Sequence, residues 1–397
     1  MSRNVEVVIS CLCGAAKQTV VLHTNESTSG PLGVDLCHCY DCRHSSGLLC
    51  VSYAPIQVPP SLNGLVAYPD ESAQPSATTP RRYFCNTCGC HVFRNSAVSG
   101  EKSDQSWKVT TGTIIERVGA DDELAEVDDE KEDPLLRYTR HINTDSTKDG
   151  GLSPFIKLVE GTESPKKSQI TDDRGGDGKD ILEAHCHCKT VRFYITRPDA
   201  SSRLPWSGFS DLIVPAATSP REARDNPRDE KWWLRPQSKD STDLTRYMAG
   251  TCACRSCRLA AGFEIQTWAF VPRSNIFFLP PASSSPSSSL SPSPSSSDAL
   301  PLDFPALQQA YSPLRTYESS PGVFREFCRR CGASVFWHDR WRPDLIDVSV
   351  GLLGADEGAR AESWSDWWRG RVSFQEDAEN GRERYVNSLK SRHGPYA

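Results

Sequence analysis

The chain has 397 residues, of which 37% are hydrophobic, and this is enough for two domains of ordinary size that each bury a core. Its net charge of −6, with acidic and basic residues interspersed, argues against a nucleic-acid-binding surface built on bulk charge. No apolar run approaches the ~18 residues of a membrane span, and residues 1–10 lack the apolar core of a secretory signal. We therefore expect a cytoplasmic protein, with the nucleus as an alternative, whose partners are neither a membrane nor a nucleic acid.

We expect residues 1–165 to form a first domain that is mainly β. Runs that are rich in β-branched or aromatic residues, or that alternate in polarity, predict strands at residues 5–9, 17–22, 48–53, 81–93, 107–115 and 155–159. The first two of these runs are close enough to pair as a hairpin. The acidic run at residues 121–133 is typical of a solvated helix or loop, with an interaction tail as the alternative.

Residues 166–179 are polar, contain two adjacent glycines and lack periodicity, so we interpret them as a linker. A second domain, residues 180–397, opens at residues 181–195 with the same strand, C-x-C, strand pattern as the first. Its motifs are spaced more widely because it carries two inserts. One covers about residues 201–240, and the other, residues 280–297, is almost entirely serine and proline and is expected to be disordered.

Fourteen of the 16 cysteines follow one order that occurs twice, namely C-x-C, then C-x-C-x-x-C, then C-x-x-C followed by glycine. In the first half they are Cys11, Cys13, Cys37, Cys39, Cys42, Cys85 and Cys88. In the second half they are Cys186, Cys188, Cys252, Cys254, Cys257, Cys328 and Cys331. We interpret this repetition as an internal duplication. Cys50 and Cys90 fall opposite Ile265 and Ala333 of the other half, so we expect them to be packing residues.

Clustered thiols in a reducing compartment indicate metal ligands, and a tetrahedron of thiolates suits zinc. Seven ligands per half cannot fill two four-cysteine sites, so the simplest division is four plus three. The two pairs would close a structural site: the first tetrad is Cys11, Cys13, Cys85 and Cys88, and the second tetrad is Cys186, Cys188, Cys328 and Cys331. The first triplet (Cys37, Cys39, Cys42) and the second triplet (Cys252, Cys254, Cys257) would each keep an open fourth position, as catalytic zinc does. We expect two zinc ions per domain and four per chain.

A histidine could fill the open position of a triplet. However, His38, His44, His91, His187 and His338 have no matching histidine in the other half, so we expect none of them to be a ligand. Disulfides are disfavoured because cysteines one residue apart would form strained rings. An alternative is that all of the zinc ions are structural and only stabilise the fold. We accept this interpretation for the tetrads, and it stays open for the triplets.

These motifs resemble the glutathione-dependent formaldehyde-activating enzyme family, which includes centromere protein V. The matching stretches begin at Cys11, Cys37 with Gly47, and Phe84, and in the second half at Cys186, Cys252 with Gly262, and Phe327. The resemblance implies two tandem β-tent domains of small antiparallel sheets, each with a structural zinc and a three-cysteine zinc that meets the substrate thiol. It implies an activity that joins glutathione to formaldehyde, which is a carbon–sulfur lyase in the reverse sense. The second half departs from the pattern at Ala253, where the first has a histidine, and at Lys189, where the first has a glycine.

The partners that follow from this resemblance are a small thiol such as glutathione and a small aldehyde. Arg43 and Arg258, which directly follow the triplets, could hold a glutathione carboxylate, or they could offset the charge of the cluster or face water. No general base is shared by both halves, and the catalytic residues beyond the open zinc sites are unknown. Two alternatives stay open: a non-catalytic zinc module that binds protein or chromatin, and an enzyme of the same fold that acts on another thiol.

Overall fold

The computed structural model describes residues 5–23, 31–70, 80–97, 105–118, 135–156, 180–237, 241–280, 299–378 and 382–389. Of these residues 39% are in strands and 17% in helices, so the predicted mainly β class is confirmed. The strands form small sheets that are antiparallel except at two strand pairs. Among the described helices, none has the length and apolar character needed to cross a membrane.

The first half supplies one sheet in which the strands run in the order β5-β6-β7-β8-β4-β2-β1-β9, with β3 joining β4 to β10. Its elements are β1 (Val5–Ile9), β2 (Gln18–Leu22), β3 (Leu32–Cys37), α1 (Tyr40–Ser46), β4 (Val51–Ile56), β5 (Leu65–Tyr68), β6 (Arg81–Cys85), β7 (His91–Ala97), β8 (Gln105–Thr110), η1 (Thr111–Thr113), β9 (Ile114–Arg117), β10 (Leu136–Ile142) and η2 (Thr144–Thr147).

The second half supplies two sheets, β11-β12-β16-β17 and β13-β14-β15-β21-β20-β19-β18, with β22 paired to β14. Its elements are β11 (Ile181–His185), β12 (Arg192–Thr196), η3 (Ser201–Arg203), α2 (Arg221–Arg224), β13 (Leu234–Pro236), β14 (Leu244–Cys252), α3 (Arg255–Ala261), β15 (Gln266–Pro272), η4 (Arg273–Asn275), β16 (Ile276–Phe278), β17 (Leu300–Pro301), α4 (Phe304–Ala310), β18 (Leu314–Ser320), β19 (Val323–Cys328), β20 (Ser334–Asp339), β21 (Leu345–Ser349), η6 (Val350–Leu352), β22 (Ser365–Trp367), η7 (Gln375–Asp377) and α5 (Glu383–Ser388).

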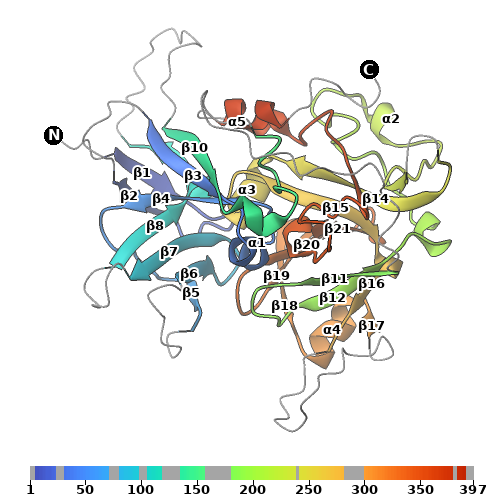
Figure 1. The fold of residues 1–397 in the computed structure, drawn as a ribbon, viewed down its shortest axis with the longest axis horizontal. Helices are drawn as coiled ribbons and strands as arrows, with labels where there is room; N and C mark the ends of the chain where they lie inside the picture. The colour runs from blue at the N-terminus through green and yellow to red at the C-terminus, as the bar shows by residue number, and fades with distance from the viewer. Residues whose placement is uncertain are drawn as a thin grey trace.

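Strand pairing follows the same scheme in both halves. The run β5-β6-β7-β8-β4-β3 of the first half has the counterpart β18-β19-β20-β21-β15-β14 in the second. The strand that carries the start of each triplet, β3 or β14, also pairs in parallel with a late strand, β10 or β22. In Figure 1 the blue and cyan strands of the first half lie on one side and the yellow to red strands of the second on the other, with α1 and α3 between them.

The two halves pack through reciprocal contacts near the triplets. The Gly112 amide donates to the Gly262 carbonyl at 3.0 Å, and the matching Gly351 amide donates to the Gly47 carbonyl at 3.0 Å. Gly47 and Gly262 end α1 and α3 in the left-handed region, with φ of 85° in both. The two hydrogen bonds are equivalent, because each joins the same two positions with the halves exchanged. Such an exchange is typical of an interface with two-fold symmetry.

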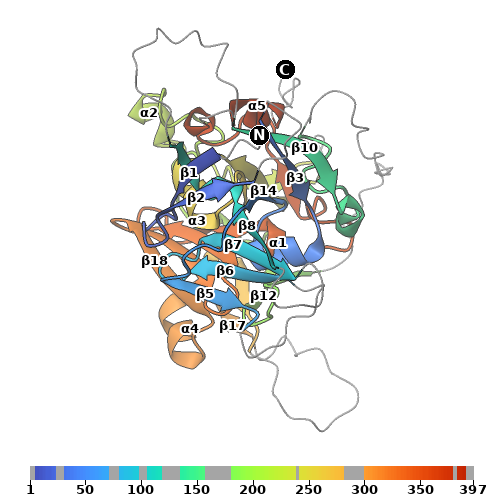
Figure 2. The ribbon, with the colours of Figure 1, turned by 90° about the vertical axis from the view of Figure 1, so that its left-hand side faces the viewer.

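A second reciprocal contact involves the glycine that ends each C-x-x-C turn. A Cβ added at Gly89 would lie 2.4 Å from the ring of Phe327, and one added at Gly332 would lie 2.4 Å from the ring of Phe84. Each of these phenylalanines precedes the C-x-x-C turn of its own half. Figure 2, which views the first half from its outer side, shows β5 to β8 in front of the orange strands of the second half.

The sequence-based elements were confirmed at both hairpins, β1·β2 and β11·β12, and at the strands around both C-x-x-C turns. Three expectations were wrong in detail. The first triplet continues into a helix rather than a turn, the strand expected at residues 48–53 is Val51–Ile56, and the run 107–115 breaks into β8, η1 and β9. Phe155 lies in a turn, and residues 157–159 are outside the described part, as are the acidic run, the linker and the Ser/Pro insert beyond residue 280.

Candidate metal centres

The structure brings the cysteines together in the four groups that the spacing predicts. Within each tetrad and each triplet the Sγ atoms all lie within 4.8 Å of one another. All 16 cysteines are free thiols, so the described chain contains no disulfide. Cys50 and Cys90 are buried and belong to none of the four groups.

The tetrads have the sulfur spacing of a zinc–thiolate centre. Cys13 Sγ lies 3.5 Å from the Sγ atoms of both Cys11 and Cys85. In the second tetrad the Cys188 Sγ lies 3.4 Å from Cys186 and 3.5 Å from Cys328. Four sulfurs about 2.3 Å from one zinc ion would stand roughly 3.8 Å apart, so these groups fit that metal.

Turns at strand ends bring each tetrad together. Cys11 and Cys13 follow β1, and Cys85 and Cys88 lie at the end of β6 and in the turn before β7. Lys189, which replaces the glycine after the first pair, adopts a left-handed φ of 59°, and Gly14 also adopts a positive φ, of 83°. The replacement of glycine by lysine therefore keeps the turn.

Each triplet combines the end of a strand with the start of a helix. Cys37 ends β3, Cys39 is the residue before α1, and Cys42 lies in its first turn. The Cys39 Sγ accepts a hydrogen bond from the Cys42 amide at 3.4 Å, which takes the place of an N-cap. The second triplet repeats this arrangement, because the Cys257 amide donates to the Cys254 Sγ at 3.2 Å.

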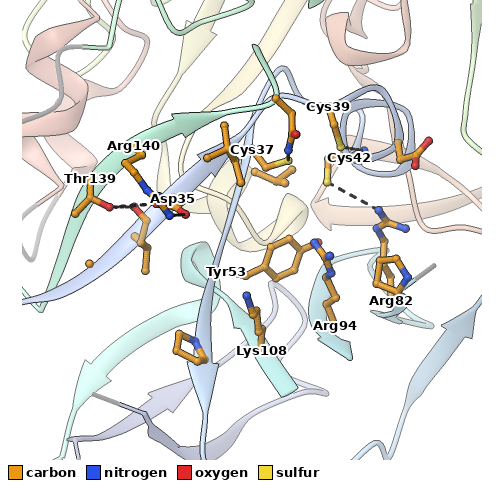
Figure 3. Close-up of a pocket in the computed structure, with 18 residues that line it drawn as sticks. Asp35, Cys37, Cys39, Cys42, Tyr53, Arg82, Arg94, Lys108, Thr139 and Arg140 are labelled. Carbon is orange, nitrogen blue, oxygen red and sulfur yellow. Dashed lines mark hydrogen bonds and ion pairs between the residues drawn. The ribbon is translucent and has the colours of Figure 1, made fainter. Parts of the chain in front are cut away.

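A cavity of about 580 Å³ lies against the first triplet (Figure 3). Its wall includes Arg82, Arg94 and Lys108, which lie side by side on β6, β7 and β8 because strand register pairs Arg82 with Arg94 and Arg94 with Lys108. Pro55 of β4 pairs with Lys108 and completes this line, which we call the first row. Arg140 on β10 also lines the cavity and forms an ion pair with Asp35 at 2.7 Å.

The cations and thiols of this cavity interact directly. Arg82 Nη2 lies 3.9 Å from the Cys42 Sγ. Hydrogen bonds from Cys37 and Cys39, and then the charges of Arg82 and Arg94, hold the pKa of Cys42 well below its ordinary value. Burial works to lower the pKa of Arg82, but the negative charge of Cys42 outweighs it and the pKa is raised. The two arginines therefore favour the thiolate form of Cys42.

Two more groups shape the cavity. The Asn143 side-chain amide donates to the Cys37 Sγ at 3.3 Å. Burial raises the pKa of Tyr53, another wall residue, to about 12, so its hydroxyl stays protonated at neutral pH. Burial, and then the neighbouring Arg94, lower the pKa of Lys108.

Neither of the arginines that follow the triplets lines this cavity, so neither is placed to hold a carboxylate in it. Arg43 is buried, and its Nε and Nη1 have no hydrogen-bond partner. Arg258 is also buried and donates to the carbonyls of Gly112 and Ile114 across the contact between halves. Neither residue faces water. Helical geometry explains this, because the residue after Cys42 or Cys257 points to another face of the helix.

The expected non-ligand histidines all lie outside the four thiol groups. His38 is buried and hydrogen-bonds His141 at 2.9 Å. His338 hydrogen-bonds Glu326 at 3.1 Å. The sequence analysis missed Arg82 and its counterpart Arg325. Arg82 lies three residues before Cys85, and Arg325 lies three residues before Cys328, the first cysteine of the C-x-x-C turn in each half. This shared spacing could have identified both arginines.

Comparison with known proteins gives one match. Residues 6–127 match the family model of the glutathione-dependent formaldehyde-activating enzyme. The matched stretch contains the first tetrad, the first triplet and the first row. No curated protein and no solved structure matches the chain.

Proposed function

We propose that the chain joins a small thiol to a small aldehyde at the first triplet, as S-(hydroxymethyl)glutathione synthase does, and is thus a carbon–sulfur lyase in the reverse sense. One observation carries this proposal: a cavity lined by cations opens onto three thiols. The family match of residues 6–127 supports it, because it spans all seven thiols of the first tetrad and the first triplet.

The residues present fit zinc at both kinds of site. Cys37, Cys39 and Cys42 would hold one ion and leave a fourth position for the substrate, while the first tetrad would hold another with all four ligands supplied. A zinc ion held in this way supplies one chemical effect, which is to favour the thiolate form of a thiol that binds it.

The chain's own residues would select and orient the thiol. Glutathione carries two carboxylates, and Arg94 and Lys108 supply positive charge in the cavity, together with Arg140, which is paired with Asp35. These three residues are far apart in the sequence, but β7, β8 and β10 bring all of them to the lining of one cavity. The volume of about 580 Å³ lies in the range typical of sites for small ligands.

The bond changes balance without an oxidant or reductant. A carbon–sulfur bond forms between the thiol sulfur and the aldehyde carbon, and the carbon–oxygen π bond breaks. The proton lost from the thiol ends on the aldehyde oxygen, which becomes a hydroxyl. Tyr53 and Lys108 are proton-carrying groups in the cavity wall and could deliver it.

We also propose that residues 180–397 are a second copy of the domain formed by residues 1–165, joined to it by residues 166–179. The common order of strand pairing and the reciprocal contacts between halves support this division. All four thiol groups would then hold zinc, which suits a reducing compartment such as the cytoplasm.

Cobalt substitution tests the proposal, because a fourth thiolate changes the charge-transfer spectrum of the ion. Glutathione is expected to change the spectrum, whereas its S-methyl derivative is not. Adduct formation from glutathione and formaldehyde is then expected to exceed the uncatalysed rate and to fall to it in Cys39→Ser. If there is neither a spectral response nor a rate gain, the proposed activity is wrong, and a non-catalytic zinc module that binds protein or chromatin is the better account.

A further inference from the structure

The second half has a row that corresponds to the first row but differs in chemistry. Register pairs Arg325 with Trp337, Trp337 with Asp347, and Asp347 with Phe270. These are the same strand positions as Arg82, Arg94, Lys108 and Pro55. Only the arginine is kept: Arg325 Nη1 lies 3.6 Å from the Cys257 Sγ, as Arg82 does from Cys42 at 3.9 Å. The other three positions hold two aromatic rings and a carboxylate.

A further side chain covers this second row. Arg342, from the loop between β20 and β21, donates to Asp347 at 2.8 Å. Its guanidinium lies 4.8 Å from the centre of the Trp337 ring and 5.8 Å from that of Phe270. Arg342 thus fills space over the row with its own ion pair, and Asp347 stands where the first half has the cation Lys108.

The insert at residues 201–237 closes the site from the side. In the first half Asp35, two residues before Cys37, lines the cavity. The corresponding residue of the second half is Gly250, and a Cβ added there would lie 2.3 Å from the Cδ1 of Leu212. The insert therefore occupies the space into which the side chain of Asp35 extends in the first half.

Asp211, the residue before Leu212 in the insert, holds Ser373 and Phe374 next to the second triplet. The Asp211 carboxylate accepts hydrogen bonds from the Phe374 amide at 2.7 Å and from the Ser373 hydroxyl at 3.1 Å. The backbone carbonyl of Ser373 accepts a hydrogen bond at 2.9 Å from the amide of Ala253, which lies within the second triplet. Asp211 itself is buried.

Phe374 corresponds to Asn143, the residue whose amide reaches Cys37 in the first half. Both residues adopt left-handed φ values, 50° and 57°, and both precede a 3-10 helix. The substitution replaces a hydrogen-bond donor by an apolar ring. The middle cysteines of the two triplets differ in exposure. Cys254 is only 8% exposed, whereas Cys39 is partly exposed.

We propose that the second triplet is a sealed metal centre, closed by Arg342, Leu212 and Phe374, which stabilises the fold and does not meet substrate. The part of this inference that assigns the chemistry to the first triplet alone rests on the proposed function. The sealing itself does not, since it concerns access and holds for any small reagent. On this proposal the second site keeps its three thiols and its arginine, while Arg342, Leu212 and Phe374 occupy the space that is open beside the first triplet.

Alkylation of the zinc-loaded full chain tests the sealing without reference to activity. Iodoacetamide is added for increasing times, and the modified cysteines are located by peptide mass spectrometry. Cys39 is expected to react at least about tenfold faster than Cys252, Cys254 or Cys257, because thiolate reactivity requires access. Equal rates, faster reaction at the second triplet, or no reaction at Cys39 would each overturn the proposal.

An opening variant gives the complementary test. Leu212→Ala combined with Phe374→Asn, in the full zinc-loaded chain, is expected to raise the alkylation rate of Cys254 about tenfold and leave that of Cys39 unchanged. Unchanged protection of Cys254 in a folded variant would contradict the role of these side chains. Failure of the proposed function would look different: no response to glutathione in the cobalt protein, with the difference between Cys39 and Cys254 intact.

Discussion

At the scale of single residues, both halves place an arginine beside their triplet, Arg82 in the first half and Arg325 in the second. Arg82 is buried and approaches Cys42 at 3.9 Å, so it offsets the charge of the thiolates without facing the solvent. Arg82→Met keeps much of the volume and removes the charge. We expect the affinity of the first triplet for metal to fall about 10- to 100-fold, as loss of an outer-shell partner typically does.

Competition with a chromophoric chelator measures that affinity. Arg137→Met serves as a control because Arg137 lies on β10 and is exposed. Metal affinity that is the same in Arg82→Met, Arg137→Met and the unmodified chain would refute the role assigned to Arg82.

Lys108 is expected to act on the substrate rather than on the metal. It lines the cavity next to Arg94 but has no thiol as a hydrogen-bond partner among the described contacts. We expect Lys108→Met to weaken glutathione binding about tenfold, since a hydrogen bond to a charged group contributes roughly 1.5–3 kcal/mol. Binding of the neutral thiol 2-mercaptoethanol is expected to change little.

Titration of the cobalt-substituted variant with the two thiols provides the measurement, with the neutral thiol as the internal control. An equal loss of affinity for both thiols would show that Lys108 does not recognise a carboxylate.

At the scale of elements, the turn that follows β6 connects a tetrad to the opposite half. Gly89 has a φ of 78° and faces Phe327, whereas Gly14 has a φ of 83° and nothing within 4 Å of an added Cβ. Gly14→Ala should therefore cost only the left-handed backbone, about 1–2 kcal/mol of unfolding free energy. Gly89→Ala should cost more, because the Cβ also displaces the Phe327 ring.

Urea unfolding of the two variants separates these contributions. Since Lys189 is tolerated at the position that corresponds to Gly14, the smaller effect at Gly14 already has a parallel in the chain. If Gly14→Ala is as destabilising as Gly89→Ala, the contact with Phe327 contributes nothing.

The two classes of thiol group should respond differently to loss of one ligand. Cys88 belongs to a tetrad that ties β1 to β6, and structural zinc contributes on the order of 10 kcal/mol to folding. Cys88→Ser is therefore expected to give insoluble protein or a large loss of thermal stability. Cys39→Ser is expected to stay folded and to lose metal from the first triplet. Similar melting temperatures for the two variants would refute this division.

The sequence was sufficient to predict the strands next to the tetrad thiols. The hairpin before Cys11 and the strands around Cys85 followed from alternation and from the C-x-x-C-G turn. The helix after Cys39 was missed because its seven residues are too few for a periodic pattern. The cavity was missed as well, since Arg94 and Lys108 become neighbours only through strand register, and Arg140 only through the pairing of β10 with β3.

At the scale of the whole molecule, the proposed duplication accounts for both the interface and the asymmetry. Reciprocal contacts at Gly47 and Gly262 pack α1 and α3 against the opposite half, so each half completes the surroundings of the other. The inserts then distinguish the halves. The wider spacing of the cysteine motifs was enough to reveal the insert at residues 201–240. Whether the insert closes the second triplet depends on the position of Leu212, which the sequence does not give.

A crystal structure of the zinc-loaded chain with glutathione tests the central claim most directly, namely that the first triplet with its cavity is where a thiol binds. Anomalous scattering is expected to locate zinc in all four thiol groups. The glutathione sulfur is expected about 2.3 Å from the zinc of the first triplet, with a carboxylate against Arg94 or Lys108. Zinc in the first triplet without glutathione at saturating concentration, or glutathione at the second triplet instead, would contradict the account.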